Sequence, residues 1–239
     1  MVKGLDTFWK YFADYEEQYV LIGGAACDIL FESNEVNFRA TRDLDMVLIV
    51  EALTPEFGEK FWEFIVDGKY RNKATNGSNP QFYRFDKPED DEFPKMIELF
   101  CRSDFKLKNA KGITPIHIDD EVSSLSAILL NDDYYKALLN GKEVRNGLSV
   151  LRPEYIILFK AKAYLDLQKR KDSGEKLDSS DIKKHKKDVL RIASELMLEK
   201  VEELPIAVDA DIHSFIDLLE QEPFDQNSLK RYGLKNENV

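Results

Sequence analysis

Residues 19–24 read YVLIGG and residues 43–48 read DLDMVL, and these two stretches decide the fold of this sequence. Both are apolar runs of strand length, and the first ends in a glycine pair. Side chains at positions i and i+2 of a strand point to one face, so Asp43 and Asp45 lie roughly 6.5–7 Å apart on the same side. The sequence therefore predicts two carboxylates on one face of an otherwise apolar strand.

Two carboxylates at this spacing need a compensating cation. Like charges repel each other, and burial beside apolar neighbours disfavours the charged form unless an opposite charge is close. Mg²⁺ prefers hard oxygen ligands and bridges carboxylates to substrate phosphates. A pair of such ions stabilises both the entering and the leaving oxygen in phosphoryl chemistry. We therefore expect Asp43 and Asp45 to hold a two-metal Mg²⁺ site.

A third carboxylate, Glu98, lies inside the apolar run MIELF at residues 96–100. A charged side chain between Ile and Leu in a strand needs a partner or a metal. If this strand neighbours the one that carries Asp43, Glu98 reaches the same cluster as its third metal ligand. Other acids precede it in a polar turn, which makes them poorer ligands: Asp90, Asp91 and Glu92.

The glycine pair, Gly23 and Gly24, ends one predicted strand and opens a predicted helix. Glycine lets the backbone approach a phosphate closely, and a helix N-terminus presents N–H groups to an anion. Alone, such a pair is more often a tight turn. In combination with the carboxylates it predicts a site for a nucleotide and its metal.

Helical and strand patterns alternate over residues 1–110, whereas helical spacing dominates from Glu154 onward. We therefore predict an α+β protein with a small mixed sheet and flanking helices, followed by a C-terminal helical bundle. The second long C-terminal helix is expected to have Ser179 or Ser180 as its N-cap. The predicted domains are a core at residues 1–118, a connector at 119–152 and a helical domain at 153–239.

The 239 residues include 34 Lys and Arg against 45 Asp and Glu, a formal net charge of −11. This acidity argues against a protein that coats nucleic acid non-specifically. Cys27 and Cys101 lie in apolar stretches and are expected to be buried, reduced thiols. No stretch approaches the roughly 20 apolar residues of a membrane span, and the N-terminus has no signal sequence pattern. We expect a cytoplasmic protein that does not contact membranes.

The glycine pair, the Asp-x-Asp motif and the strand acid together resemble the nucleotidyltransferase superfamily of DNA polymerase beta. More narrowly, the sequence is similar to the AbiEii/MenT-like nucleotidyltransferase toxins of bacterial type IV toxin–antitoxin systems. These proteins share an Arg-x-Thr-x-Asp-x-Asp block, which is present here as Arg39, Thr41, Asp43 and Asp45. The resemblance implies the nucleotide-binding residues Gly23, Gly24, Arg39 and Thr41, and the catalytic metal ligands Asp43, Asp45 and Glu98.

The same toxins carry a helical Lys-x-x-Ala block and a later Lys/Arg-Asp pair. The first is present as Lys160 and Ala163, and the second as Lys187 and Asp188. The resemblance implies that Lys160 reaches the triphosphate, that Asp188 supports it in catalysis and that Lys187 helps to bind the nucleotide. Lys162, on the same helix, competes with Lys160 for the phosphate contact.

The resemblance implies transfer of an NMP from an NTP to an acceptor hydroxyl, with Mg²⁺ as cofactor. The implied acceptor is a tRNA 3′ end or a protein, and the implied partner is an antitoxin protein. Residues 153–200 carry 12 Lys and Arg against 9 Asp and Glu and are the basic stretch that would line a tRNA groove. One alternative is a small-molecule acceptor such as an aminoglycoside. Another is a catalytically idle nucleotide-binding or interaction module.

Overall fold

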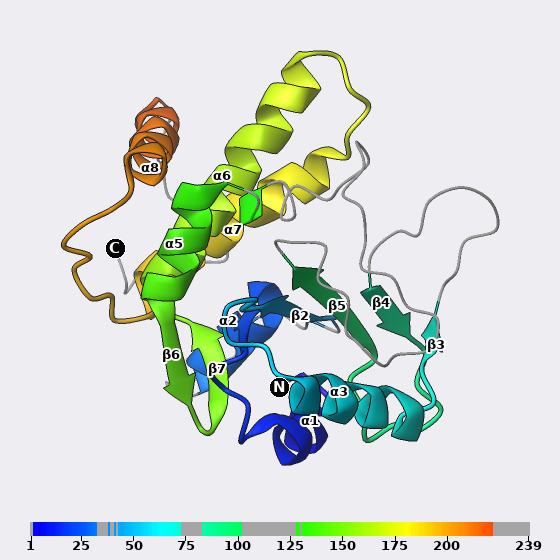
Figure 1. Cartoon of the computed structure of the whole chain (residues 1–239). Helices are drawn as coiled ribbons and strands as arrows, with labels where there is room; N and C mark the ends of the chain where they lie inside the picture. The colour runs from blue at the N-terminus through cyan, green and yellow to red at the C-terminus, as the bar shows by residue number, and fades with distance from the viewer. Residues whose placement is uncertain are drawn as a thin grey trace. The chain divides into compact units, whose positions relative to one another are not determined.

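The computed structural model of the chain divides into two compact units (Figure 1). The sheet unit comprises Met1–Glu121 and Lys142–Leu151, and the helical unit comprises Val122–Gly141 and Arg152–Val239. The residues that the structure describes are 2–32, 38, 41, 43–72, 83–101, 128–129 and 131–221.

The sheet unit is built on a seven-stranded mixed sheet with the strand order β3-β4-β5-β2-β1-β7-β6 (Figure 1). The β2–β5 and β1–β7 pairs are parallel, and the other neighbours are antiparallel. Since β2 is the central strand, β1 and β5 bring their residues next to its two aspartates. The strands are β1 (Tyr19–Ile22), β2 (Asp43–Leu48), β3 (Arg71–Asn72), β4 (Tyr83–Asp86), β5 (Met96–Cys101), β6 (Lys142–Arg145) and β7 (Leu148–Leu151).

The segment predicted as a connector, residues 119–152, is divided between the two units. Helix α5 (Asp132–Gly141) belongs to the helical unit, whereas β6 and β7 form a hairpin that extends the sheet beside β1. The hairpin turn is Asn146-Gly147, and both residues have positive φ angles, 53° and 73°. Asn-Gly is the pair that tight two-residue hairpin turns favour. The sheet therefore includes a segment well beyond the predicted boundary at residue 118.

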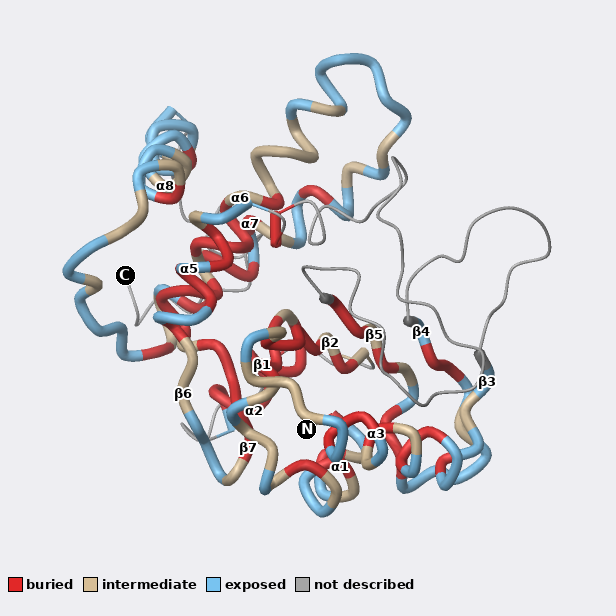
Figure 2. Tube along the Cα trace, in the orientation of Figure 1, coloured by how far each residue is buried: buried red, intermediate tan, exposed pale blue. Residues whose placement is uncertain are grey.

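An aromatic cluster fixes helices α1 (Leu5–Phe12) and α3 (Pro55–Asp67) against the sheet. The Phe12 ring lies 5.3 Å from that of Phe64 on α3, and the Phe8 ring lies 5.5 Å from that of Tyr19 on β1, measured between centroids. All four residues are fully buried. Figure 2 shows buried segments along α1 and α3. Burying each Phe side chain contributes roughly 1.5–3 kcal/mol. The cluster therefore contributes to the packing of α1 and α3 against the sheet.

The helical unit is organised around its longest helix, α6 (Pro153–Asp172), with α7 (Ser179–Glu195) and α8 (Ile206–Glu220) packed against it. A small apolar core takes one side chain from each of the three helices: Ala161, Val189 and Phe215. The first long helix begins at Pro153, which lies in its first turn.

The N-cap of α7 differs from the predicted one. The cap is Asp178, whose carboxylate accepts a hydrogen bond of 2.8 Å from the Ser180 backbone N–H. A carboxylate at this position also interacts favourably with the positive end of the helix dipole, which a serine hydroxyl does not. The prediction of Ser179 or Ser180 was therefore wrong by one or two residues.

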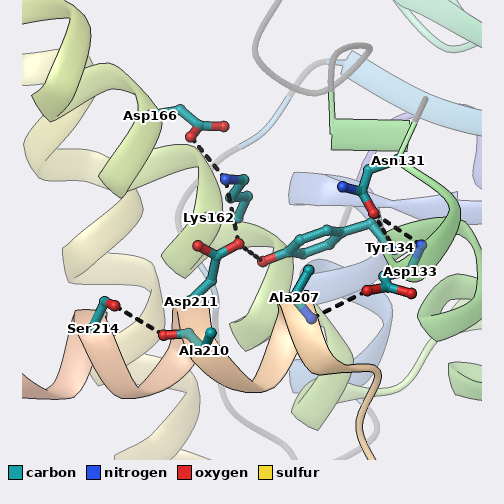
Figure 3. Close-up of polar contacts among 9 residues, drawn as sticks. All are labelled: Asn131, Asp133, Tyr134, Lys162, Asp166, Ala207, Ala210, Asp211 and Ser214. Atoms are coloured by element: carbon teal, nitrogen blue, oxygen red, sulfur yellow. Dashed lines mark hydrogen bonds and ion pairs between the residues drawn. The ribbon is translucent and has the colours of Figure 1, made fainter.

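A polar network joins α5, α6 and α8 (Figure 3). The Tyr134 hydroxyl donates to the Asp211 carboxylate at 3.0 Å, and the Lys162 ammonium lies 3.3 Å from the same carboxylate and 3.0 Å from Asp166. Burial, reinforced by the Asp211 charge, raises the pKa of Tyr134, which keeps its hydroxyl protonated as the donor. At the start of α8, the Ala207 N–H donates to Asp133 of α5 at 3.1 Å.

The observed elements confirm the predicted fold class, an α+β chain with a mixed sheet, flanking helices and a helical C-terminal part. Cys27 is buried as a reduced thiol, as predicted. In the part of the chain that the structure describes, no helix is both long and apolar enough to cross a membrane.

Candidate functional site

The predicted acids lie side by side at the centre of the sheet. Asp45 on β2 is the register partner of Glu98 on β5, and Asp43 lies two residues before it on the same strand. Leu44 and Met46 are fully buried, whereas both aspartates are partly exposed, which confirms the predicted alternation. Register partners on neighbouring strands share a face, so all three carboxylates are on one side of the sheet.

The glycine pair brings the backbone against this group of acids. Helix α2 (Gly23–Glu32) begins directly after β1, and Gly23 has a φ of +63°. A Cβ atom on Gly23 would lie 2.2 Å from the Asp45 Oδ2 atom, and one on Gly24 would lie 2.5 Å from the Thr41 Oγ1 atom. A larger residue at either position would force these side chains to move. The start of α2 therefore adjoins Asp45 and Thr41, and the N-terminal end of a helix attracts anions.

The acids considered as alternatives to Glu98 lie in an exposed turn, as predicted. Asp90 accepts a hydrogen bond of 2.9 Å from the Glu92 N–H, and Asp91 lies 3.5 Å from the Lys3 ammonium. Arg39 falls outside the described residues.

Glu98 has a partner that the sequence did not reveal. Arg84 on β4 is its register partner, and its Nη2 atom forms an ion pair with the Glu98 Oε1 atom. Arg84 alternates with the buried Phe85 along its strand, which marks it as a residue of the opposite face. Its relation to Glu98, however, depends on strand register and is not visible in the sequence.

The donor chemistry of two residues in this group, Asp43 and Asp45, fits Mg²⁺. Asp43 and Asp45 offer carboxylate oxygens on one accessible face of a strand, which is the donor type that Mg²⁺ prefers. Glu98 is engaged by Arg84, and among the described residues no three His, Cys, Asp or Glu side chains stand close enough to hold a metal ion. The role of Glu98 as third ligand stays a prediction.

Lys160 and Asp188 form a buried ion pair between α6 and α7. Their Nζ and Oδ2 atoms are 2.7 Å apart, and the two side chains are only 8% and 5% exposed. Lys187, the neighbour of Asp188, is exposed. The structure thus brings together Lys160 and Asp188 but not Lys187. The roles of all three residues in nucleotide binding stay predictions.

Lys162, the competitor of Lys160, also has carboxylate partners, Asp166 and Asp211 (Figure 3). Burial would lower the pKa of Lys162, but the hydrogen bonds and charges of these carboxylates outweigh it and raise the pKa above its usual value. The lysine is therefore held as a cation in the network between α6 and α8.

No protein-family model matches the chain, and no curated protein matches it. Among solved structures, the chain is similar to an antigenic nucleotidyltransferase-like protein from Paracoccidioides brasiliensis, with 16% sequence identity and a TM-score of 0.42. The alignment covers 96% of this chain and 91% of the other chain.

Replacing Gly23 by Ala should destabilise the protein more than a positive φ angle alone requires. A non-glycine residue in such a conformation costs about 1–3 kcal/mol, and the contact with Asp45 adds to this cost. Gly174→Ala is the matched control, because Gly174 has a φ of +96° and a Cβ there would meet nothing within 4 Å. Urea unfolding should show a larger loss in the free energy of unfolding for Gly23→Ala than for Gly174→Ala. Equal losses would contradict the close approach.

Replacing Lys160 by Met should destabilise the helical unit strongly, because it deprives the buried Asp188 carboxylate of the Lys160 charge. Removing one partner of a buried ion pair costs about 3–5 kcal/mol. Lys169→Met, at an exposed position on the same helix, should change stability by less than about 0.5 kcal/mol. Thermal unfolding followed by circular dichroism measures both variants. A Lys160→Met protein as stable as the control would show that the ion pair is not a structural element.

Proposed function

We propose that the chain is a Mg²⁺-dependent nucleotidyltransferase, which moves an NMP from an NTP to an acceptor hydroxyl and releases pyrophosphate. One observation carries the proposal: Asp43, Asp45 and Glu98 share one face of the sheet, and the Gly23 backbone closely approaches Asp45. Carboxylates for a cation and a helix N-terminus for phosphates are then adjacent.

In this proposal, Asp43 and Asp45 hold the metal, and Glu98 joins them to accept the proton of the acceptor hydroxyl. Bound Mg²⁺ would neutralise the charge that develops on the transferred phosphoryl group. The Gly23-Gly24 backbone and the Thr41 hydroxyl would orient the triphosphate. The contribution of these residues is mainly positioning and electrostatic stabilisation, as in other phosphoryl-transfer sites.

The proposed acceptor is a tRNA 3′ end or a protein hydroxyl, and the proposed biological setting is that of a toxin with an antitoxin partner. The basic stretch at residues 153–200 supports RNA binding, whereas the net charge of −11 supports a small cationic acceptor such as an aminoglycoside. The salt dependence of tRNA binding separates the two, because binding through phosphates weakens steeply as salt concentration rises.

The Asp43→Asn/Asp45→Asn double variant should lose Mg²⁺-dependent transfer of label from NTP by more than about a hundredfold. The assay supplies each labelled NTP with cellular RNA and with protein. Glu143→Gln is the matched control, because Glu143 is a strand carboxylate of the same sheet that pairs with Arg145 on the hairpin strand β6. Transfer retained by the double variant would contradict the proposal.

A catalytically idle nucleotide-binding module is the alternative, and the ion pair between Arg84 and Glu98 favours it. Calorimetry with NTP and Mg²⁺ distinguishes the two. Binding that depends on Asp43 and Asp45, without transfer to any RNA, protein or small-molecule acceptor, would support the idle module.

A further inference from the structure

A row of register partners crosses the sheet through the proposed site. Arg84 on β4 pairs with Glu98 on β5, Glu98 pairs with Asp45 on β2, and Asp45 pairs with Ile22 on β1. Neighbouring strands are about 4.7–4.9 Å apart, and register partners share a face. A guanidinium therefore lies at one end of a row that contains two of the proposed metal ligands.

The Glu98 carboxylate needs a positively charged partner in its partly buried surroundings. Its side chain is 18% exposed, and its chain neighbours Ile97 and Leu99 are buried in the core. A carboxylate in such surroundings is costly without a compensating charge. In the structure, Arg84 supplies that charge.

Arg84 is suited to leave Glu98 when a stronger cation arrives. Its side chain is 46% exposed, so the guanidinium can return to solvent without loss of hydration. Ion pairs at exposed positions are weak, because water and the entropy of a long side chain offset most of their attraction. A divalent cation next to Asp45 carries twice the charge and competes for the same carboxylate.

We propose that Arg84 is the exchangeable counter-ion of Glu98. Its guanidinium holds the carboxylate until a divalent cation binds at Asp43 and Asp45, and it is then displaced from Glu98 by that cation. No covalent bond changes, because one cation replaces another beside Glu98. Arg84 is thus a positioning residue that sets the affinity for the metal. This inference rests on the proposed function.

Calorimetric titration of the full chain with Mn²⁺ tests the exchange. Arg84→Gln removes the competing charge and should tighten Mn²⁺ binding about two- to fivefold, which corresponds to the strength of an exposed ion pair. Arg145→Gln is the matched control: its ion pair with Glu143 has side chains 50% and 21% exposed, close to the values for Arg84 and Glu98. Arg145→Gln should leave the affinity unchanged, and Arg84→Lys should stay closer to wild type than Arg84→Gln.

The same titration in a Glu98→Gln background separates exchange at Glu98 from a general effect of charge. Once Glu98 is neutral, Arg84→Gln should no longer tighten Mn²⁺ binding. A similar gain in both backgrounds would overturn the proposal, as would unchanged or weaker binding by Arg84→Gln with intact Glu98.

The titration also distinguishes a failure of the role proposed for Arg84 from a failure of the proposed metal site. Mn²⁺ binding that Asp43→Asn/Asp45→Asn abolishes, but that Arg84→Gln does not tighten, would overturn the role of Arg84 and leave the metal site standing. Absence of Mn²⁺ binding in both wild type and Arg84→Gln would overturn the metal site and the role of Arg84 together.

Discussion

The parallel pairing of β2 with β5 is the constraint on which the arrangement of the sheet unit depends. It aligns Asp45 with Glu98, and the antiparallel pairing of β1 with β2 places Ile22, and so the glycine pair, beside the same aspartate. A slip of one residue would turn the aspartates into the core and Leu44 and Met46 out of it. The apolar alternation of β2 therefore fixes the position of the carboxylates as firmly as it fixes the core.

Two ion pairs of similar chemistry have opposite energetic consequences. Lys160 and Asp188 are almost fully buried, so separating them exposes neither charge to water and is costly. Arg84 and Glu98 differ in exposure, and the exposed arginine can leave its partner at little cost once another cation compensates the Glu98 charge. The first pair is suited to hold two helices together, and the second is suited to respond to a ligand.

The sequence predicted the parts of the fold that depend on local pattern. Alternation identified the face of Asp43 and Asp45, and the glycine pair after an apolar run identified the start of α2. The sequence predicts a connector at residues 119–152, because pattern alone does not show that β7 pairs with β1, more than a hundred residues earlier in the chain.

The charge partners were the least predictable features of the two units. Arg84 and Glu98 are brought together by antiparallel register, and Lys160 and Asp188 by the packing of two helices. Neither ion pair can be predicted from the spacing of these residues along the chain. The N-cap of α7 was missed for a more local reason, since Asp178, Ser179 and Ser180 are all good capping residues and the structure selects the charged one.

We propose that the acids on β2 hold a divalent cation next to the glycine pair. The most direct measurement is the anomalous scattering of manganese in crystals grown with Mn²⁺ and a non-hydrolysable NTP analogue. We expect manganese density between the Asp43 and Asp45 carboxylates, with the analogue phosphates at the Gly23 end of α2 and Glu98 turned from Arg84 toward the metal. Manganese bound elsewhere, and none at Asp43 and Asp45, would contradict this metal site.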